Sequence, residues 1–128
     1  MSHVDIRDVA AAVVAVLSGS GHEGKAYPLT GPEALTQKQV AEKLSKATGR
    51  TIQYFDLPVA DVKKAMLASG MPEWSADAVL DLTRLYRDGG ASLVDPTIEQ
   101  LIGRKRISFD QFAREYANAF RAEELAAS

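Results

Sequence analysis

The chain has 128 residues, a formal net charge of -2 from 15 basic and 17 acidic residues, and no cysteine. The absence of cysteine excludes disulfides, thiolate catalysis and cysteine-ligated zinc, and the near-even charge balance argues against nucleic acid as a partner. Hydrophobic residues make up 46% and charged residues 25%, which is typical of one globular domain spanning residues 1–128.

The first predicted element is a short extended piece from Val4 that turns into a helix ending near Leu17. Asp5 is placed to cap this helix and Asp8 adds favourable charge in its first turn. An apolar stripe at helical spacing predicts that the helix packs on a core; it consists of Val9, Val13, Val16 and Leu17. The apolar run is too short for a membrane span, and no basic region precedes it as in a signal peptide. We therefore expect no membrane partner and a cytoplasmic protein.

Two strands are predicted around a helix in the next part of the chain. Residues 26–30 form a brief apolar strand, and residues 51–57 are rich in β-branched and aromatic residues. The helix between them begins with a capping box, in which Thr36 is the N-cap and Gln39 the reciprocal partner, and it ends at Gly49.

Four further helices are predicted after Pro58. The first runs over residues 59–69, and the second begins near Pro72 or Ser75 and runs to Asp88 with an inward stripe. That stripe comprises Trp74, Ala78, Leu82, Leu85 and Tyr86. A short helix follows Asp95-Pro96, and a last one starts with a second capping box and bears an aromatic stripe. The box is Ser108 with Gln111, and the stripe is Phe109, Phe112, Tyr116 and Phe120.

The expected fold class is therefore α/β and predominantly helical, with six or so helices and two or three short strands. Residues 122–128 are expected to fray, and residues 1–3 are either a genuine start or a cloning remnant. The basic run at residues 104–106 is interpreted as a solvated loop.

The sequence contains no residue pattern that indicates a catalytic site. His3 and His22 lie at the N-terminus and in a Gly-rich turn, where a surface role is the simpler interpretation. Gly19, Gly21 and Gly24 match G-x-G-x-x-G, but the turn follows a helix and precedes a strand, so no helix N-terminus faces it. We predict no catalytic residue, no metal ligand and no cofactor-binding residue in this chain alone.

Several stretches together resemble the C-terminal part of NmrA-like proteins, which are atypical short-chain dehydrogenases/reductases. They are "VDIRDVAAAVVAVL", "GKAYPLTGPEALTQKQVAEKLSKATGRTIQYFDLP", "GMPEW" and "LIGRKRISFDQFAREY". The resemblance implies a two-part protein, in which an N-terminal Rossmann domain binds NAD(P) and a smaller helical part closes over the substrate. No residue here matches the family's nucleotide motif, so NAD(P) is implied only for a full-length relative.

The resemblance also bears on partners. In extended reductases the strand matching residues 26–30 belongs to the Rossmann sheet, so here it lacks neighbours and predicts a strand-pairing interface in a homo-oligomer, most simply a dimer. The candidate residues are Ala26, Tyr27, Leu29 and Thr30. The segment around "GMPEW" is expected near the cleft between the two parts, as a site for a small apolar ligand or an interface. Its candidate residues are Met66, Met71, Trp74 and Tyr86.

Two functions follow from these observations. The preferred one is a non-catalytic binding or oligomerisation module, because no titratable catalytic groups converge. The alternative is half of an NAD(P)H-dependent quinone or dye reductase, whose Rossmann domain is missing or supplied by another chain. For Trp74 itself, a core position at the start of a helix is weighed against a place in the interface.

Overall fold

A computed structural model describes residues 1–120, and within them it contains six α-helices and no β-strand. The helices are α1 (Ile6–Ser18), α2 (Gln37–Thr48), α3 (Val59–Ala68), α4 (Glu73–Arg87), α5 (Thr97–Ile102) and α6 (Phe109–Glu115). The predominantly helical class is confirmed, and the expected helices all form. The predicted fraying of residues 122–128 lies outside the described residues.

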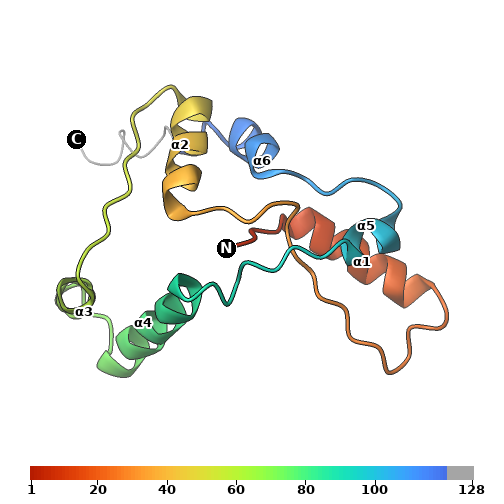
Figure 1. Ribbon diagram of the computed structural model, residues 1–128, viewed down its shortest axis with the longest axis horizontal. Helices are drawn as coiled ribbons and strands as arrows, with labels where there is room; N and C mark the ends of the chain where they lie inside the picture. The colour runs from red at the N-terminus through yellow and green to blue at the C-terminus, as the bar shows by residue number, and fades with distance from the viewer. Residues whose placement is uncertain (121–128) are drawn as a thin grey trace.

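The helices associate in three pairs that extended segments connect (Figure 1): α1 with α5, α2 with α6, and α3 with α4. Within residues 1–120, no helix brings its backbone close to a helix of another pair, and side chains such as Arg7 of α1, which reaches Glu115 of α6 at 2.7 Å, make the contacts between pairs. We call the α3–α4 pair the arm and the other four helices the body. The arm joins the body through residues 49–58 and 88–96, which run without regular structure.

Local capping explains where the helices begin. At α2 both halves of the predicted capping box form, and Gly49 ends the helix in the left-handed region with φ 73°. At α6 the Ser108 side chain accepts from the Gln111 backbone, but the Gln111 side chain donates to Glu115 instead of closing the box. Asp5 accepts from the Arg7 N–H and caps α1 as predicted.

The predicted strands are wrong. Residues 26–30 and 51–57 are extended, yet in the described part of the chain neither lies in a ladder of backbone hydrogen bonds. At the start of the second segment, the Ile52 N–H donates to the Ser45 hydroxyl at 2.8 Å, so a side chain replaces a strand partner. A strand needs a neighbouring backbone, and these helix pairs provide none.

Two predicted core stripes are also wrong. Helix α1 buries Asp8 and Ala12, whereas its predicted stripe residues Val13 and Leu17 are 46% and 81% exposed. Helix α4 packs through Ala76 and Leu80, and leaves most of the predicted stripe exposed, with Trp74 at 76%, although Tyr86 is half-buried. Both helices are apolar on two faces, and in each the buried face is not the one that the predicted stripe marks. The hydrophobic core consists of Ala12, Leu35, Ala41, Ala76, Leu80, Ile98, Ala113 and Ala117.

Buried polar groups link the body. The Asp8 carboxylate accepts the Ile107 N–H at 2.6 Å and pairs with Arg104 at 2.7 Å. The Arg106 side chain is 6% exposed, and its Nη1 donates to the carbonyl oxygens of Gly31 at 2.9 Å and Asp95 at 2.6 Å. The interpretation of residues 104–106 as a solvated loop is therefore wrong, because two of the three arginine and lysine side chains tie the α5–α6 connection to distant segments.

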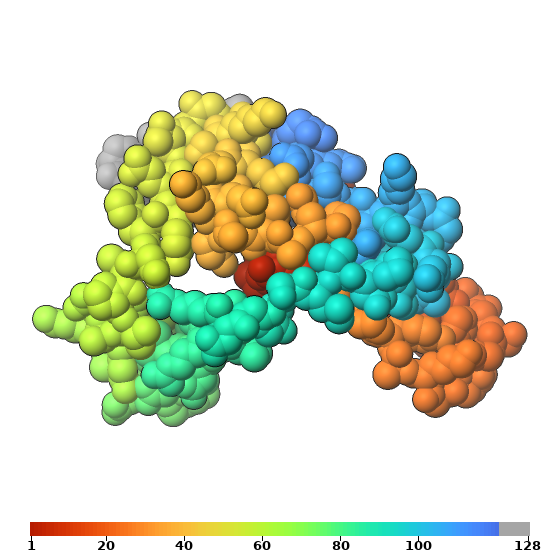
Figure 2. Space-filling model, in the orientation of Figure 1, coloured from red at the N-terminus to blue at the C-terminus, as the bar shows by residue number. Residues whose placement is uncertain are grey.

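The resulting molecule is open. Figure 2 shows the arm and the α1 region projecting from one side of the molecule with a broad hollow between them. The whole chain exposes 8806 Å², whereas a compact monomer of 13.8 kDa exposes about 6,600 Å². The helices thus form as predicted, but much of their apolar surface stays uncovered.

Candidate functional site

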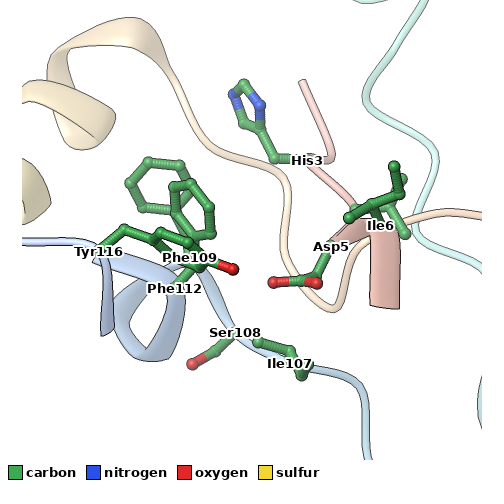
Figure 3. Close-up of a pocket in the computed structure, with 9 residues that line it drawn as sticks. His3, Asp5, Ile6, Ile107, Ser108, Phe109, Phe112 and Tyr116 are labelled. Carbon is green, nitrogen blue, oxygen red and sulfur yellow. The ribbon is translucent and has the colours of Figure 1, made fainter. Parts of the chain in front are cut away.

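One cavity lies where the N-terminal segment meets α6. Its volume is about 280 Å³, and Figure 3 shows the aromatic side chains of α6 on one side and Asp5 and Ile6 on the other. The residues lining it are His3, Val4, Asp5, Ile6, Ile107, Ser108, Phe109, Phe112 and Tyr116. The wall is largely apolar because the predicted aromatic stripe of α6 turns three of its rings toward this space.

An ionic link fixes the rim of this cavity. Arg7 forms a two-pronged contact with the Asp5 carboxylate, Nε to Oδ1 at 2.9 Å and Nη2 to Oδ2 at 2.8 Å, and reaches Glu115 at 2.7 Å. Its guanidinium carbon also lies 5.8 Å from the ring centre of Tyr116. The hydrogen bond from Arg7 lowers the pKa of the Asp5 carboxyl, although partial burial opposes this. Asp5 is therefore held in its ionised form, and both of its carboxylate oxygens are engaged by Arg7.

His3 lies at the upper edge of the cavity, against Phe109 with ring centres 5.5 Å apart. Burial lowers the pKa of His3, and the nearby N-terminal ammonium lowers it further, so the neutral ring is favoured at neutral pH. Its Nε2 is buried without a hydrogen-bond partner among the described residues. The ring therefore contributes a neutral aromatic surface.

The chemistry that this cavity supports is binding. The Ser108 hydroxyl caps α6, both Asp5 oxygens are bound to Arg7, and His3 Nε2 makes no hydrogen bond within residues 1–120, so these groups do not form an activated nucleophile. A flat apolar molecule matches such a wall better than a charged one. Residues 1–120 also hold no group of three or more histidine or acidic side chains that could bind a metal.

Sequence reasoning missed this cavity. The aromatic stripe and the Ser108–Gln111 capping box indicated only a helix with one aromatic face. What brings the stripe to His3 and Asp5 is the long-range bond from Ile107 to Asp8, across 99 positions of sequence. The available signal was that each of the two segments, residues 3–6 and 107–116, contains a side-chain helix N-cap, Asp5 in the first and Ser108 in the second.

The structure does not assemble the four predicted ligand or interface residues into one pocket wall. Met66 and Met71 are half-buried where the arm turns, and the Met71 N–H donates to the Met66 carbonyl at 3.1 Å. Tyr86 is half-buried at the far end of α4, whereas Trp74 stands exposed at its start. The interpretation of Trp74 as a core residue is wrong, and its role at a ligand or interface stays a prediction.

The predicted strand-pairing residues lie on the open side of α1. Among residues 1–120, the backbone N–H and C=O groups of Ala26, Tyr27 and Leu29 have no hydrogen-bond partner. Thr30 differs, because its hydroxyl accepts the Asp95 N–H at 2.9 Å. A second cavity of about 230 Å³ adjoins the segment; it is lined by Ala12, Val13, Val16, Leu17, Tyr27, Leu29 and Leu101. Pairing of this segment with another strand stays a prediction.

None of the helices in residues 1–120 combines the length and apolarity needed to cross a bilayer. A comparison with models of known protein families finds no match.

Individual reductases do match the chain. It is 41% identical over 122 residues to the NAD(P)H azoreductase of Xenophilus azovorans, which covers 95% of this chain and 43% of the azoreductase. It is 38% identical over 96 residues to quinone oxidoreductase 2 of Escherichia coli strain K12, which covers 75% of this chain and 34% of that protein.

Solved structures agree with these matches. The crystal structure of an NADPH-dependent quinone oxidoreductase from Escherichia coli superposes with a TM-score of 0.79 at 32% identity, over 90% of this chain and 42% of that one. The triphenylmethane reductase of Citrobacter sp., solved with NADP(H), has a TM-score of 0.78 at 24% identity, covers 91% of this chain and 40% of that one, and shows the fold alone. The chain thus spans less than half the length of each relative, and it is homologous to part of NAD(P)H-dependent azoreductases and quinone oxidoreductases.

Proposed function

We propose that this chain is the substrate-side, C-terminal part of an NmrA-like NAD(P)H-dependent reductase of the quinone or dye type. It acts together with a Rossmann nucleotide-binding part, in the same polypeptide or another, and the 128 residues alone bind no dinucleotide. NAD(P)H supplies the hydride in such a protein, and the groups described here position and cover the substrate.

The observation that carries the proposal is the uncovered apolar face of α1. Ile6 is 80%, Val14 is 64% and Leu17 is 81% exposed, and these side chains share one side of the helix with Ala10 and Val13. Fully burying an aliphatic side chain stabilises a protein by about 1.5–3 kcal/mol, so a helix with such a face is normally covered. Beside it run the unpaired backbone groups of residues 26–29. An apolar helix face next to an extended segment with unpaired backbone groups is the surface that a sheet with covering helices complements.

The matched relatives support this assignment of the partner. Their names include NAD(P)H or NADPH as the reductant, and more than half of each lies outside the match. The hollow between the arm and the α1 region gives that remainder a place against α1 (Figure 2).

Reconstitution tests the proposal. The chain is co-expressed with the portion of the Xenophilus azovorans azoreductase that lies outside the matched 43%, and oxidation of NADPH is followed with a quinone and with an azo dye. We expect co-purification and turnover by the mixture, and no turnover by this chain alone.

Two variants give this experiment its controls. Leu17→Glu on the open face of α1 is expected to abolish co-purification, whereas Leu93→Glu, an equally apolar and 58% exposed residue in the connection before α5, is expected to leave it intact. Saturable quenching of Trp74 fluorescence by NADPH in the isolated chain at micromolar concentration would contradict the proposal. Co-purification that survives Leu17→Glu would place the contact elsewhere and contradict the assigned surface.

A non-catalytic binding or oligomerisation module is the second candidate. Its support is the same lack of an assembled nucleophile and base at the His3–Asp5 cavity. Reconstitution separates the two candidates, because a module of this kind yields no turnover with the azoreductase portion.

A further inference from the structure

Helix α4 carries an exposed apolar stripe that no part of the described chain covers. Trp74 is 76%, Leu82 is 47% and Leu85 is 52% exposed, and with Ala78 they recur at spacings of four, four and three residues. This spacing places them on one line along the helix. The opposite face, with Ala76 and Leu80, is buried against α3. The stripe is therefore additional to the face that holds the arm together.

A line of charges runs beside this stripe and changes sign along it. Asp77, Asp81 and Arg84 recur at spacings of four and three residues, one line over from the apolar stripe. Their side chains are 52%, 70% and 63% exposed, so all three reach solvent. The acidic residues lie toward the N-terminal end of the line and the basic residue toward the C-terminal end.

We propose that two copies of this chain associate through α4, with the two helices antiparallel about a two-fold axis. In an antiparallel pair, the same edge of each helix faces the other copy. Trp74 of one copy then lies against Leu85 of the other, Ala78 against Leu82, and Asp77 against Arg84. One register brings all three contacts within reach, because the midpoints of the three pairs lie within about one residue of each other along the helix, or about 1.5 Å. A parallel arrangement would instead set Asp77 against Asp77.

The axis also creates one unfavourable contact. Asp81 lies near the centre of the line and therefore faces its own copy across the axis. Its pairing with Arg84 at 2.6 Å reduces the repulsion but does not remove it. A parallel arrangement would carry the same Asp81 contact and add Asp77 against Asp77, so the Asp77–Arg84 contact is the signature of the antiparallel geometry.

The dimer is of the weak class. Helix α4 has 15 residues and is therefore about 22 Å long. A single helix face of that length offers less than the roughly 800 Å² per partner of a standard stable interface. Association through α4 uses a surface distinct from the α1 face assigned above to the nucleotide-binding part, so either proposal can fail alone.

Sedimentation velocity over about 1 to 300 µM, a range that brackets weak interfaces, tests the proposal with Trp74 emission recorded in parallel. We expect a concentration-dependent dimer and a blue shift of the emission maximum, because the only Trp of the chain leaves water on association. Leu82→Glu is expected to weaken the dimer at least tenfold and to hold the emission at the monomer value. Val14→Glu, an exposed apolar residue of α1, is the matched control and is expected to change neither.

Charge exchange tests the register independently. Asp77→Arg alone and Arg84→Asp alone are each expected to weaken the dimer several-fold, and an equimolar mixture of the two is expected to restore it. Asp81→Asn is expected to strengthen it. Far-UV circular dichroism confirms that each variant keeps its helices.

Several outcomes would overturn the proposal. They are a monomer at every concentration, a dimer that Leu82→Glu leaves intact with unshifted emission, or single charge variants whose mixture associates no better than either alone. A dimer broken by Val14→Glu instead would place the interface on the α1 side.

Discussion

The body and the arm are built from similar amphipathic helices but are held together differently. In the body, buried polar side chains connect segments that are far apart in sequence: Asp8 reaches Ile107, and Arg106 reaches Gly31 and Asp95. The arm has only local contacts between α3 and α4 and exposed ion pairs such as that of Lys63 with Asp77. Long-range polar links therefore hold the segments of the body together, whereas the two helices of the arm are held by their contacts with each other.

The largest expected effect is in the body, at Asp8. Replacing a buried, paired carboxylate by alanine leaves the Ile107 N–H without an acceptor and Arg104 without its partner. We expect Asp8→Ala to lower the free energy of unfolding by about 3 kcal/mol, in the range for breaking buried pairs. Urea unfolding followed by far-UV circular dichroism measures this. Asp8→Asn keeps an acceptor oxygen and should therefore lower the free energy of unfolding by less. An equal decrease in the two variants would show that the negative charge of Asp8, and not its acceptor oxygen, provides the stabilisation.

The next effect tests how closely the body's segments approach. A Cβ at Gly31 would lie 1.7 Å from the His3 carbonyl oxygen, which is backbone and has little room to move. We expect Gly31→Ala to cost about 1–3 kcal/mol of unfolding free energy, as overpacking does. Gly24→Ala is the comparison: its Cβ meets open space, although its φ of 71° is unfavourable for alanine. The urea midpoint should fall further for Gly31→Ala, and the reverse order would contradict the close approach.

A small effect is expected in the arm. Lys63 pairs with Glu73 at 3.0 Å and Asp77 at 2.7 Å, and the hydrogen bonds of Asp77 first and then Glu73 raise its pKa. These partners are exposed, so solvent screens them. We expect Lys63→Met to leave the urea midpoint almost unchanged in 0.15 M salt. A loss as large as that of Asp8→Ala would show that the arm also relies on polar links.

The smallest expected effect is a pH dependence of the stability of the body, which arises from His3. Burial lowers its pKa in the folded state, so the unfolded chain binds a proton more readily. The contribution of neutral His3 to the free energy of unfolding is therefore fully present above the ordinary histidine pKa of about 6.5. It is lost as the pH falls toward the lower pKa of His3 in the folded state. We expect the urea midpoint to decrease between pH 7.5 and pH 5, and His3→Gln to reduce that decrease.

Local sequence signals predicted the helices well. The Thr36–Gln39 box, the Ser108 cap and the Asp5 cap all place helix starts within the residues that follow them. They succeed because a cap and its helix lie within four residues, so the interaction is present in any fold that the chain adopts. The strands at residues 26–30 and 51–57 failed for the opposite reason, since a strand exists only where a second backbone lies beside it.

The candidate site was less accessible to sequence reasoning. The stripe that contains Trp74 was wrongly assigned to the core, because spacing shows that residues share a face and not which face is inward. The His3–Asp5 cavity was missed, since the bond between Asp8 and Ile107 that closes it spans 99 positions.

The sequence by itself determined where the helices begin and end, the absence of thiol chemistry, and a relationship to reductases that comparison with known proteins supports in part. Only the tertiary structure decided which apolar faces are buried, that residues 104–106 lock the body, and that α1 and α4 each leave a stripe open. The physical reason is range: caps and periodicity act within a few residues, whereas burial depends on what the rest of the molecule places against each face.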